Sequence, residues 1–164
     1  MEIYLLRHGE AEPRESSSPD AERALTARGK RDVQTVAEQV SAGNVRPEVV
    51  LTSPLLRAKE TAAIAQKVMG VKRLLETKAL LPDTAPETLW KELSSLEQAE
   101  RVVLAGHEPC LSRLAQFLLR SKIEMDFKKG AMMRISTPRA GGPQGVLKWM
   151  ITPRVSRKRN RPTP

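Results

Sequence analysis

The sequence predicts an α/β protein in which a mostly parallel sheet lies between two layers of helices. Short, apolar segments that are typical of buried strands alternate along the chain with longer segments in which apolar residues recur at helical spacing. This alternation indicates βαβ units, whose helices cover both faces of a parallel sheet. At 164 residues the chain is long enough for one domain with a sizeable core and short for two.

The first half of the chain contains the clearest of these units. The expected order is a strand over 2–6, a polar loop over 10–23, a helix over 26–40, a strand over 47–53 and a helix over 54–70. Thr26 is a suitable N-cap for the first helix, and Pro54 is expected in the first turn of the second. Gly70 is expected to end that second helix.

The second half continues the pattern and then changes it. We expect a short strand over 72–75, a helix over 86–97, a strand over 101–107, a helix over 109–120, and two closing strands over 131–136 and 146–152. Gly141, Gly142, Pro143 and Gly145 predict a turn between the closing strands.

Three of the expected strands end in polar motifs. These are Arg7-His8-Gly9, Thr52-Ser53-Pro54 and Gly106-His107-Glu108. The carboxyl ends of parallel strands meet at one edge of a sheet, where ligands of such folds bind. The chain has only two histidines, and both lie at such strand ends. Either histidine alone could be a structural core residue, but their equivalent positions favour a shared site.

The residue types at this edge suit phosphoryl transfer. The guanidinium groups of Arg7 and Arg57 match phosphate oxygens, and the helices that begin near Pro54 and Pro109 would add positive potential. A neutral imidazole is a nucleophile near neutral pH, and a phosphohistidine intermediate would divide the reaction into two easier steps. This chemistry needs no metal and no cofactor. The alternative for Arg57 is a solvated helix residue beside Glu60 or Thr61.

Four stretches, in order along the chain, resemble motifs of the histidine phosphatase superfamily, whose fold is phosphoglycerate mutase-like. They are LLRHGEAE at the first strand end, RALTARG (23–29), LTSPLLRAKETA (51–62) and VLAGHEPCLSRL (103–114). The GHEP-x-L-S form is similar to the small phosphohistidine phosphatases of the SixA type. The resemblance implies a three-layer α/β/α sandwich without the large insertion lid of longer members.

The resemblance also implies roles for individual residues. His8 would be the nucleophile, with Arg7, Arg57 and His107 forming the phosphate pocket around it. Arg23 would contact substrate, and Gly9 would let the backbone approach the phosphate closely.

The general acid is the one component that the family pattern does not locate here. Many members supply a carboxylate before the fourth strand, and LLPDTAPETLWKEL does not match their pattern. The candidate donors are Glu10, Asp83, Glu87 and Glu108. A phosphohistidine substrate needs little acid catalysis, because its imidazole is already a good leaving group. We therefore expect a phosphohistidine phosphatase acting on a His-phosphorylated protein.

Two other functions stay open. A small-molecule phosphomonoesterase of the same superfamily would use the same pocket on small phosphorylated substrates. A catalytically weak module that binds phospho-ligands or polyanions would use the basic residues alone.

The charge of +9 is concentrated at the end of the chain. Residues 154–164 contain five Lys or Arg and no acid, so the remainder carries only +4 (9 − 5). We expect one domain over 1–153 and a basic, disordered tail over 154–164. Nucleic acid is an unlikely partner apart from weak tail contacts, because two Phe, two Trp and one Tyr offer few stacking platforms.

Composition also bears on the expected cellular location of the protein. No apolar stretch approaches the roughly 18 residues of a membrane span, and the N-terminus does not read as a secretory leader. A single cysteine, Cys110, excludes an internal disulfide, and one Cys with two His is too few for a structural zinc site. We therefore expect a cytoplasmic protein without a membrane partner.

Overall fold

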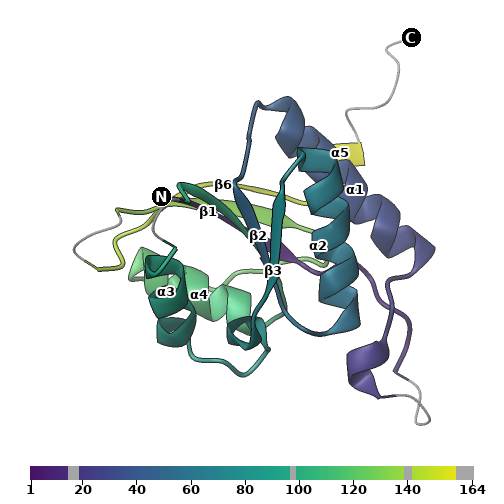
Figure 1. Ribbon diagram of the computed structural model, residues 1–164, viewed down its shortest axis with the longest axis horizontal. Coiled ribbons are helices and arrows are strands. Elements are labelled where there is room, and N and C mark those ends of the chain that lie inside the picture. Colours follow the sequence, from purple (N-terminus) through teal and green to yellow (C-terminus); the bar gives the residue numbers. More distant parts are fainter. Residues whose placement is uncertain (15–18, 97–98, 139–141, 158–164) are drawn as a thin grey trace.

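A computed structural model describes residues 1–14, 19–96, 99–138 and 142–157 of the chain. Its helices and strands follow one another in the order drawn in Figure 1. They are β1 (Glu2–Arg7), η1 (Asp20–Glu22), α1 (Ala27–Ala42), β2 (Val49–Thr52), α2 (Leu56–Met69), β3 (Arg73–Glu76), η2 (Lys78–Leu80), α3 (Pro86–Ser94), β4 (Arg101–Gly106), α4 (Cys110–Leu119), β5 (Met132–Ser136), β6 (Val146–Ile151) and α5 (Pro153–Arg157).

The strands form a single six-stranded sheet in the order β3-β2-β4-β1-β5-β6. The four strands from β3 to β1 pair in parallel, whereas β5 and β6 pair antiparallel. Helices α3 and α4 lie on one side of the sheet, and α1, α2 and α5 lie on the other (Figure 1). This arrangement confirms the predicted three-layer α/β class with a mostly parallel sheet.

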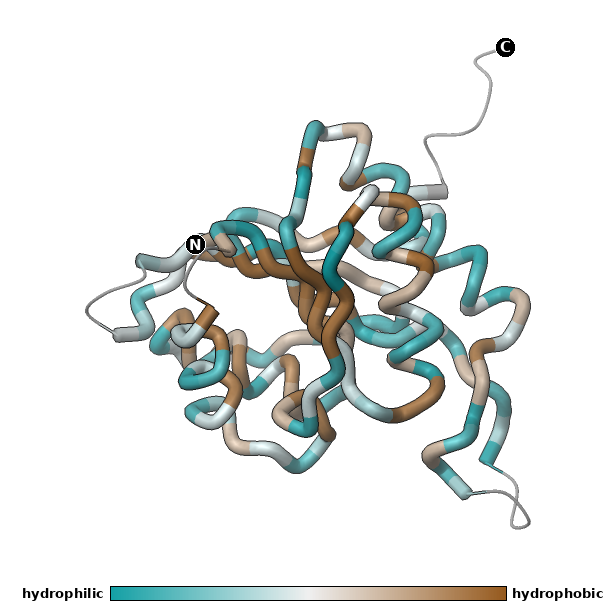
Figure 2. The backbone as a smooth tube through the Cα atoms, viewed as in Figure 1, coloured by the Kyte–Doolittle hydropathy of each residue, from teal (hydrophilic) through white to brown (hydrophobic). Residues whose placement is uncertain are grey.

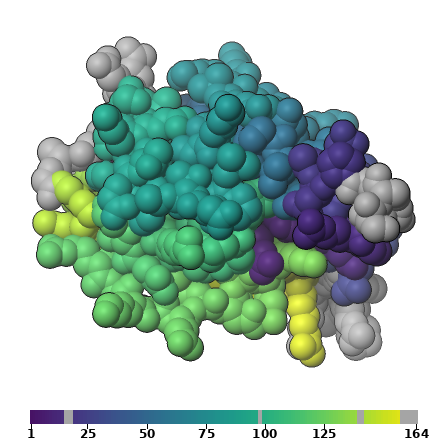
Figure 3. All heavy atoms as spheres, turned by 90° about the horizontal axis from the view of Figure 1, so that it is seen from below, coloured from purple at the N-terminus to yellow at the C-terminus, as the bar shows by residue number. Residues whose placement is uncertain are grey.

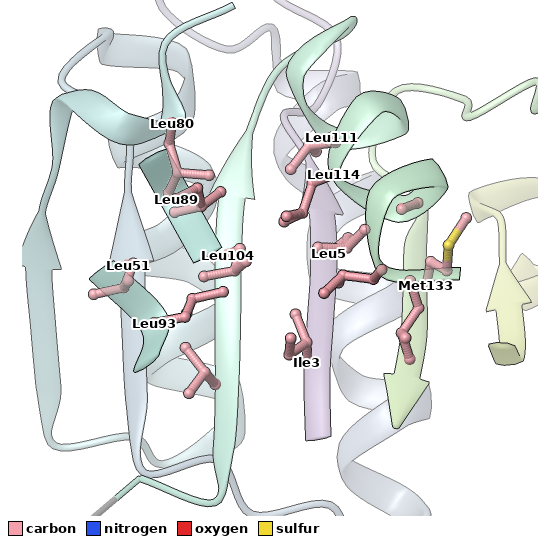
Figure 4. Close-up of a cluster of buried hydrophobic side chains, with 14 of the residues drawn as sticks. Ile3, Leu5, Leu51, Leu80, Leu89, Leu93, Leu104, Leu111, Leu114 and Met133 are labelled. Atoms are coloured by element: carbon pink, nitrogen blue, oxygen red, sulfur yellow. The ribbon is translucent and has the colours of Figure 1, made fainter. Parts of the chain in front are cut away.

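Alternate residues of each central strand enter different cores, since successive side chains point to opposite faces of a sheet. On β1, Ile3 and Leu5 pack with the leucines of α3 and α4, as Figure 4 shows. Tyr4 and Leu6 pack with the apolar residues of α1 and α2. The brown strands at the centre of Figure 2 are apolar on both faces for this reason.

The ends of several helices differ from the sequence prediction. Thr26 is the N-cap of α1, as expected, and its hydroxyl accepts a hydrogen bond from the Gly29 amide at 2.9 Å. Pro54, in contrast, lies before α2, because Leu55 is extended and forms the N-cap. Helix α3 ends at Ser94, three residues earlier than predicted, where Ser95 forms the C-cap.

The segment predicted as a tail begins with ordered structure. Residues 153–157 form α5, which packs against α1, and Ser156 is buried. The Ser156 hydroxyl donates a hydrogen bond to the Thr152 carbonyl at 3.2 Å. The rest of the expected tail, residues 158–164, lies outside the described residues, as does Gly141 of the predicted turn.

Candidate active site

Three strand ends lie side by side at one edge of the sheet. The His8 amide donates to the Gly106 carbonyl at 3.0 Å, and the Ser53 amide donates to the Ala105 carbonyl at 3.1 Å. These bonds extend the β1–β4 and β2–β4 ladders by one residue. The face below this edge is seen in Figure 3, where purple N-terminal residues reach the surface between teal and green parts of the chain.

The two histidines meet at this edge. The ring centroids of His8 and His107 lie 5.0 Å apart, with 52° between their planes. Both side chains are buried, with only 7% and 2% of their surfaces exposed. A tightly packed pair of imidazoles is unlike two independent core histidines, and it is what the shared-site hypothesis requires.

His8 is oriented by its own neighbour. Its Nδ1 lies 2.7 Å from the Gly9 carbonyl oxygen. Because a carbonyl can only accept a hydrogen bond, Nδ1 must carry the proton, and Nε2 of the neutral ring then carries a lone pair. Burial and, to a smaller extent, the positive charges of Arg57, Arg7 and Lys129 together lower the pKa of His8 to about 4, although the hydrogen bond to the Gly9 carbonyl opposes them. The His8 imidazole is therefore neutral near neutral pH, with its lone pair on Nε2.

His107 is oriented by Ser53. The His107 Nε2 lies 2.8 Å from the Ser53 Oγ, which in turn accepts a hydrogen bond from the Leu55 amide at 3.3 Å. If the hydroxyl donates its own proton to Nε2, the imidazole proton lies on Nδ1, a buried atom with no partner among the described residues. Burial chiefly, with the charges of His8, Arg57 and Arg7, lowers the pKa of His107 to about 3, so its imidazole is neutral near neutral pH.

Arg7 offers a second buried donor. One Nη group donates to the Phe127 carbonyl at 2.5 Å, whereas Nε is buried and has no partner among the described residues. Burial lowers the pKa of Arg7, although the carboxylates of Glu108 and Asp126 favour its charged form. An unpaired buried donor costs about 1–3 kcal/mol. Arg7 Nε and His107 Nδ1 are two such atoms at adjoining strand ends, and this arrangement suits an anionic ligand.

Arg57 is buried near both imidazoles, but its guanidinium is engaged. Its Nη1 donates to the Asp20 carbonyl at 2.8 Å, and its Nη2 lies 3.1 Å from the Asp20 carboxylate. Arg23 donates to the same carboxylate at 2.8 Å and to the Glu12 carbonyl. Arg23, through its hydrogen bond, is the largest cause lowering the pKa of Asp20. Asp20, which links the two arginines, was not predicted as a site residue from the sequence.

The candidate proton donors have other positions or partners. The Glu10 carboxylate lies 3.6 Å from the Arg28 Nε. The Glu108 carboxylate accepts hydrogen bonds from the amide and hydroxyl of Ser112, and so caps α4. Asp83 lies exposed in the turn after η2, and Glu87 is exposed in the first turn of α3.

Packing against the first turn of α1 explains why position 9 is a glycine. A Cβ at Gly9 would lie 2.7 Å from the Gly29 carbonyl oxygen, and a Cβ at Gly29 would lie 2.1 Å from the Glu10 carbonyl oxygen. The two glycines thus let the loop after β1 contact the first turn of α1. The Gly9 amide donates to the buried hydroxyl of Thr61 at 3.2 Å. This packing requires a glycine at position 9, and the expected close approach of its backbone to phosphate stays a prediction.

Two absences can be stated for the described part of the chain. It contains no group of three or more His, Cys, Asp or Glu side chains that could hold a metal ion. None of the helices within that part is long and apolar enough to cross a membrane.

The fold, with two imidazoles and two arginines at one sheet edge, fits an enzyme of phosphoryl transfer. Comparison with known families agrees, since the model of the histidine phosphatase superfamily (branch 1) matches residues 3–81. An uncharacterised protein of Picosynechococcus sp. is 34% identical over 122 residues, which are 71% of this chain and 72% of the relative. The chain therefore belongs to the histidine phosphatase superfamily, and its enzyme class is that of a phosphatase.

The chain is also similar to phosphohistidine phosphatases along nearly its whole length. Phosphohistidine phosphatase SixA of Escherichia coli is 24% identical over 159 residues, which are 93% of this chain and 94% of that protein. A solved structure of the protein histidine phosphatase SixA with tungstate superposes with a TM-score of 0.87 at 24% identity. That superposition covers 94% of this chain and 99% of the solved chain, so the two share the fold.

Proposed function

We propose that the protein removes phosphate from a phosphorylated histidine of another protein and carries that phosphate transiently on His8. The observation that carries this proposal is the direction of the His8 lone pair. The Nδ1 bond to the Gly9 carbonyl leaves Nε2 free to attack, beside the unpaired donors on Arg7 and His107. The likeness to the relative named phosphohistidine phosphatase SixA supports the substrate class.

The reaction has two displacements. His8 Nε2 attacks phosphorus and the phosphorus–nitrogen bond of the substrate breaks. The substrate imidazole, protonated on its other nitrogen, takes the bonding electron pair and leaves as a neutral ring. Water then attacks the phosphorus on His8, the phosphorus–nitrogen bond to Nε2 breaks, and the water's protons leave with inorganic phosphate, so the neutral His8 ring with its proton on Nδ1 is restored. Arg7, Arg57 and the His107 Nδ1–H would stabilise the charge on the phosphoryl oxygens, which supplies most of the catalysis in phosphoryl transfer.

The two carboxylates close to the histidines in sequence favour a substrate whose leaving group departs easily. Glu10 is paired with Arg28 and Glu108 with Ser112, so neither is positioned as a dedicated acid. The departing imidazole of a phosphohistidine accepts a proton near neutral pH and needs less help than an alkoxide. A small phosphomonoester is the competing substrate class. It fits this site less well, because its alkoxide leaving group would require such an acid.

Rapid-quench labelling tests the nucleophile. The protein is mixed with a phosphohistidine protein that carries labelled phosphate, and the acid-labile label on the enzyme is measured. His107→Asn is the matched control, because it also removes one buried imidazole of the site. We expect label on the unaltered protein and on His107→Asn, and none on His8→Ala. Label on His8→Ala would disprove the proposed intermediate.

A substrate panel tests the class of substrate. The kcat/KM for the phosphohistidine protein is compared with values for sugar phosphates and nucleotides, with His8→Ala as the blank. We expect the phosphohistidine protein to be turned over faster. Faster turnover of a small phosphomonoester would assign the protein to that class, and binding without turnover of any substrate would indicate a binding module.

A further inference from the structure

A groove leads from Arg7 along the start of α1, away from the imidazole pair. Its first part is a cavity of about 370 Å³. The second is a cavity of about 620 Å³ that continues to Arg154 at the start of α5. Both cavities are lined by Arg28, Asp32, Asp126, Lys128 and Lys129. Because they share these residues, they adjoin, and we call them together the α1 groove.

The α1 groove continues along α1. A third cavity of about 370 Å³ is lined by Arg28, Arg31, Asp32 and Thr35, all from the first turns of this helix. The groove is thus bounded by α1, the loop over 126–129 and the beginning of α5. In Figure 3 a yellow C-terminal stretch lies on the same face as the purple N-terminal residues.

Cations outnumber acids along this groove. Its lining contains six cations, namely Arg7, Arg28, Arg31, Lys128, Lys129 and Arg154, and three acids, namely Glu10, Asp32 and Asp126. The carboxylates of Glu10 and Asp32 lie 3.6 and 3.8 Å from the Arg28 Nε, and the Asp126 carboxylate lies 2.5 Å from the Lys128 Nζ.

The internal ion pairs leave an excess of positive charge. Among the described side chains, Arg31, Lys129 and Arg154 form no ion pair, and all three are exposed. Such charges act through complementary charges on a partner and raise both the rate of encounter and the selectivity for it.

The position of the groove selects the part of the substrate that can reach it. Arg7 lines the groove and also carries the unpaired donor of the phosphate pocket. When a phosphoryl group lies at His8, the chain on either side of the phosphorylated residue is therefore within reach of the groove. An extended peptide segment matches this elongated shape better than a compact small molecule does.

We propose that the α1 groove binds an acidic segment of the substrate protein, adjacent in sequence to the phosphorylated histidine. Aspartate and glutamate side chains of that segment pair with Arg31, Lys129 and Arg154. This inference rests on the proposed function, because it presupposes a phosphohistidine protein at His8.

The test uses three synthetic phosphohistidine peptides of equal length, with acidic, neutral or basic residues beside the phosphohistidine. Phosphoramidate, which has a phosphorus–nitrogen bond and no flanking residues, reports on the chemistry alone. The variant is Arg31→Glu/Arg154→Glu, since neither residue lines the part of the groove that contains Arg7. The control is Lys72→Glu/Arg73→Glu, two exposed cations at the amino end of β3, with the same change in net charge.

We expect kcat/KM to be highest for the acidic peptide and to fall about tenfold for that peptide in Arg31→Glu/Arg154→Glu. The same variant should leave phosphoramidate turnover unchanged, and the control should leave all substrates within twofold. Equal kcat/KM values for the three peptides, or an equal loss in both variants, would show that the α1 groove does not bind an acidic segment. The proposed function would then still stand. If neither phosphoramidate nor any peptide is hydrolysed, the proposed function itself fails.

Discussion

Arg57 donates hydrogen bonds to both the carbonyl and the carboxylate of Asp20, at 2.8 and 3.1 Å. The guanidinium that we propose for the phosphate pocket is therefore already bound to an anionic side chain of the same protein. Arg23 also donates to this carboxylate, so the single negative charge of Asp20 is shared by both guanidinium groups. The proposed role of Arg57 thus implies that a substrate phosphate competes with Asp20 for this guanidinium.

Asp20→Asn tests this competition, since asparagine keeps the shape and the backbone acceptor and removes the charge. We expect inorganic phosphate to become a stronger competitive inhibitor, with an inhibition constant about fivefold lower. A partly exposed ion pair of this kind is worth about 1 kcal/mol. Arg23→Gln is the control for the loss of a single charge in this cluster. A higher inhibition constant in Asp20→Asn would mean that Asp20 chiefly positions Arg57 for the phosphate.

The acid limb of activity is expected to follow the charge on His8. Its pKa is lowered to about 4, so kcat/KM should be constant from neutral pH down to about pH 5 and fall below that as the ring gains a proton. Lys129 is one of the cations that disfavour the protonated ring. Lys129→Gln should therefore raise the pKa and move the acid limb to higher pH. Lys122→Gln, on an exposed lysine of the same loop, is the control and should leave the limb in place.

Buried neutral histidines should also make the fold sensitive to acid. Burial lowers the pKa of His107 to about 3, below the value of about 6.5 in an unfolded chain. The unfolded state then binds more protons, so the free energy of unfolding falls as the pH drops below about 6.5. From pH 7 to pH 5, the difference between the folded and unfolded pKa of His107 should lower the free energy of unfolding by about 2 kcal/mol. His107→Asn should reduce that decrease in urea titrations at both pH values; an equal decrease in both proteins would contradict it.

The contact between Gly9 and Gly29 should be sensitive to a single methyl group. Gly29→Ala would place a Cβ 2.1 Å from the Glu10 carbonyl oxygen, so the backbone would have to shift. We expect a loss of more than about 2 kcal/mol in the free energy of unfolding, as for other overpacked sites. Gly43→Ala is the control, because its Cβ would lie 3.3 Å from the nearest atom. Similar stabilities of the two variants, measured by urea unfolding, would disprove this view of the contact.

Local sequence patterns were sufficient for the fold and for the centre of the site. The apolar strands that precede His8 and His107 could be recognised because an apolar run and the glycine and polar residues that end it are local signals. The helix that begins after Thr26 was visible for the same reason, through its cap and its valines. Once parallel pairing was inferred, topology alone placed both imidazoles at one sheet edge.

Contacts between distant segments could not be inferred in this way. Asp20 lies in a polar loop without periodicity, 37 residues before its partner Arg57. Lys129 belongs to a loop after α4 that no motif marked, yet the Gly130 amide there donates to the carbonyls of Arg7 and His8. Only tertiary packing determines such pairs. The packing role of Gly9 could not be inferred for the same reason, because its close neighbour Gly29 lies on another element.

Ser53 provides the last test, because its role follows from one hydrogen bond. Its Oγ lies 2.8 Å from the His107 Nε2 and is fully buried with it. Ser53→Ala should let the imidazole proton move between its two nitrogens, so that Nδ1 no longer always donates to the phosphate. We expect kcat to fall about tenfold, consistent with a weakened donor of about 1–1.5 kcal/mol, with KM changed much less. Ser53→Thr, which retains the hydroxyl, should recover most of the activity; if both variants lose kcat equally, the hydroxyl does not orient His107.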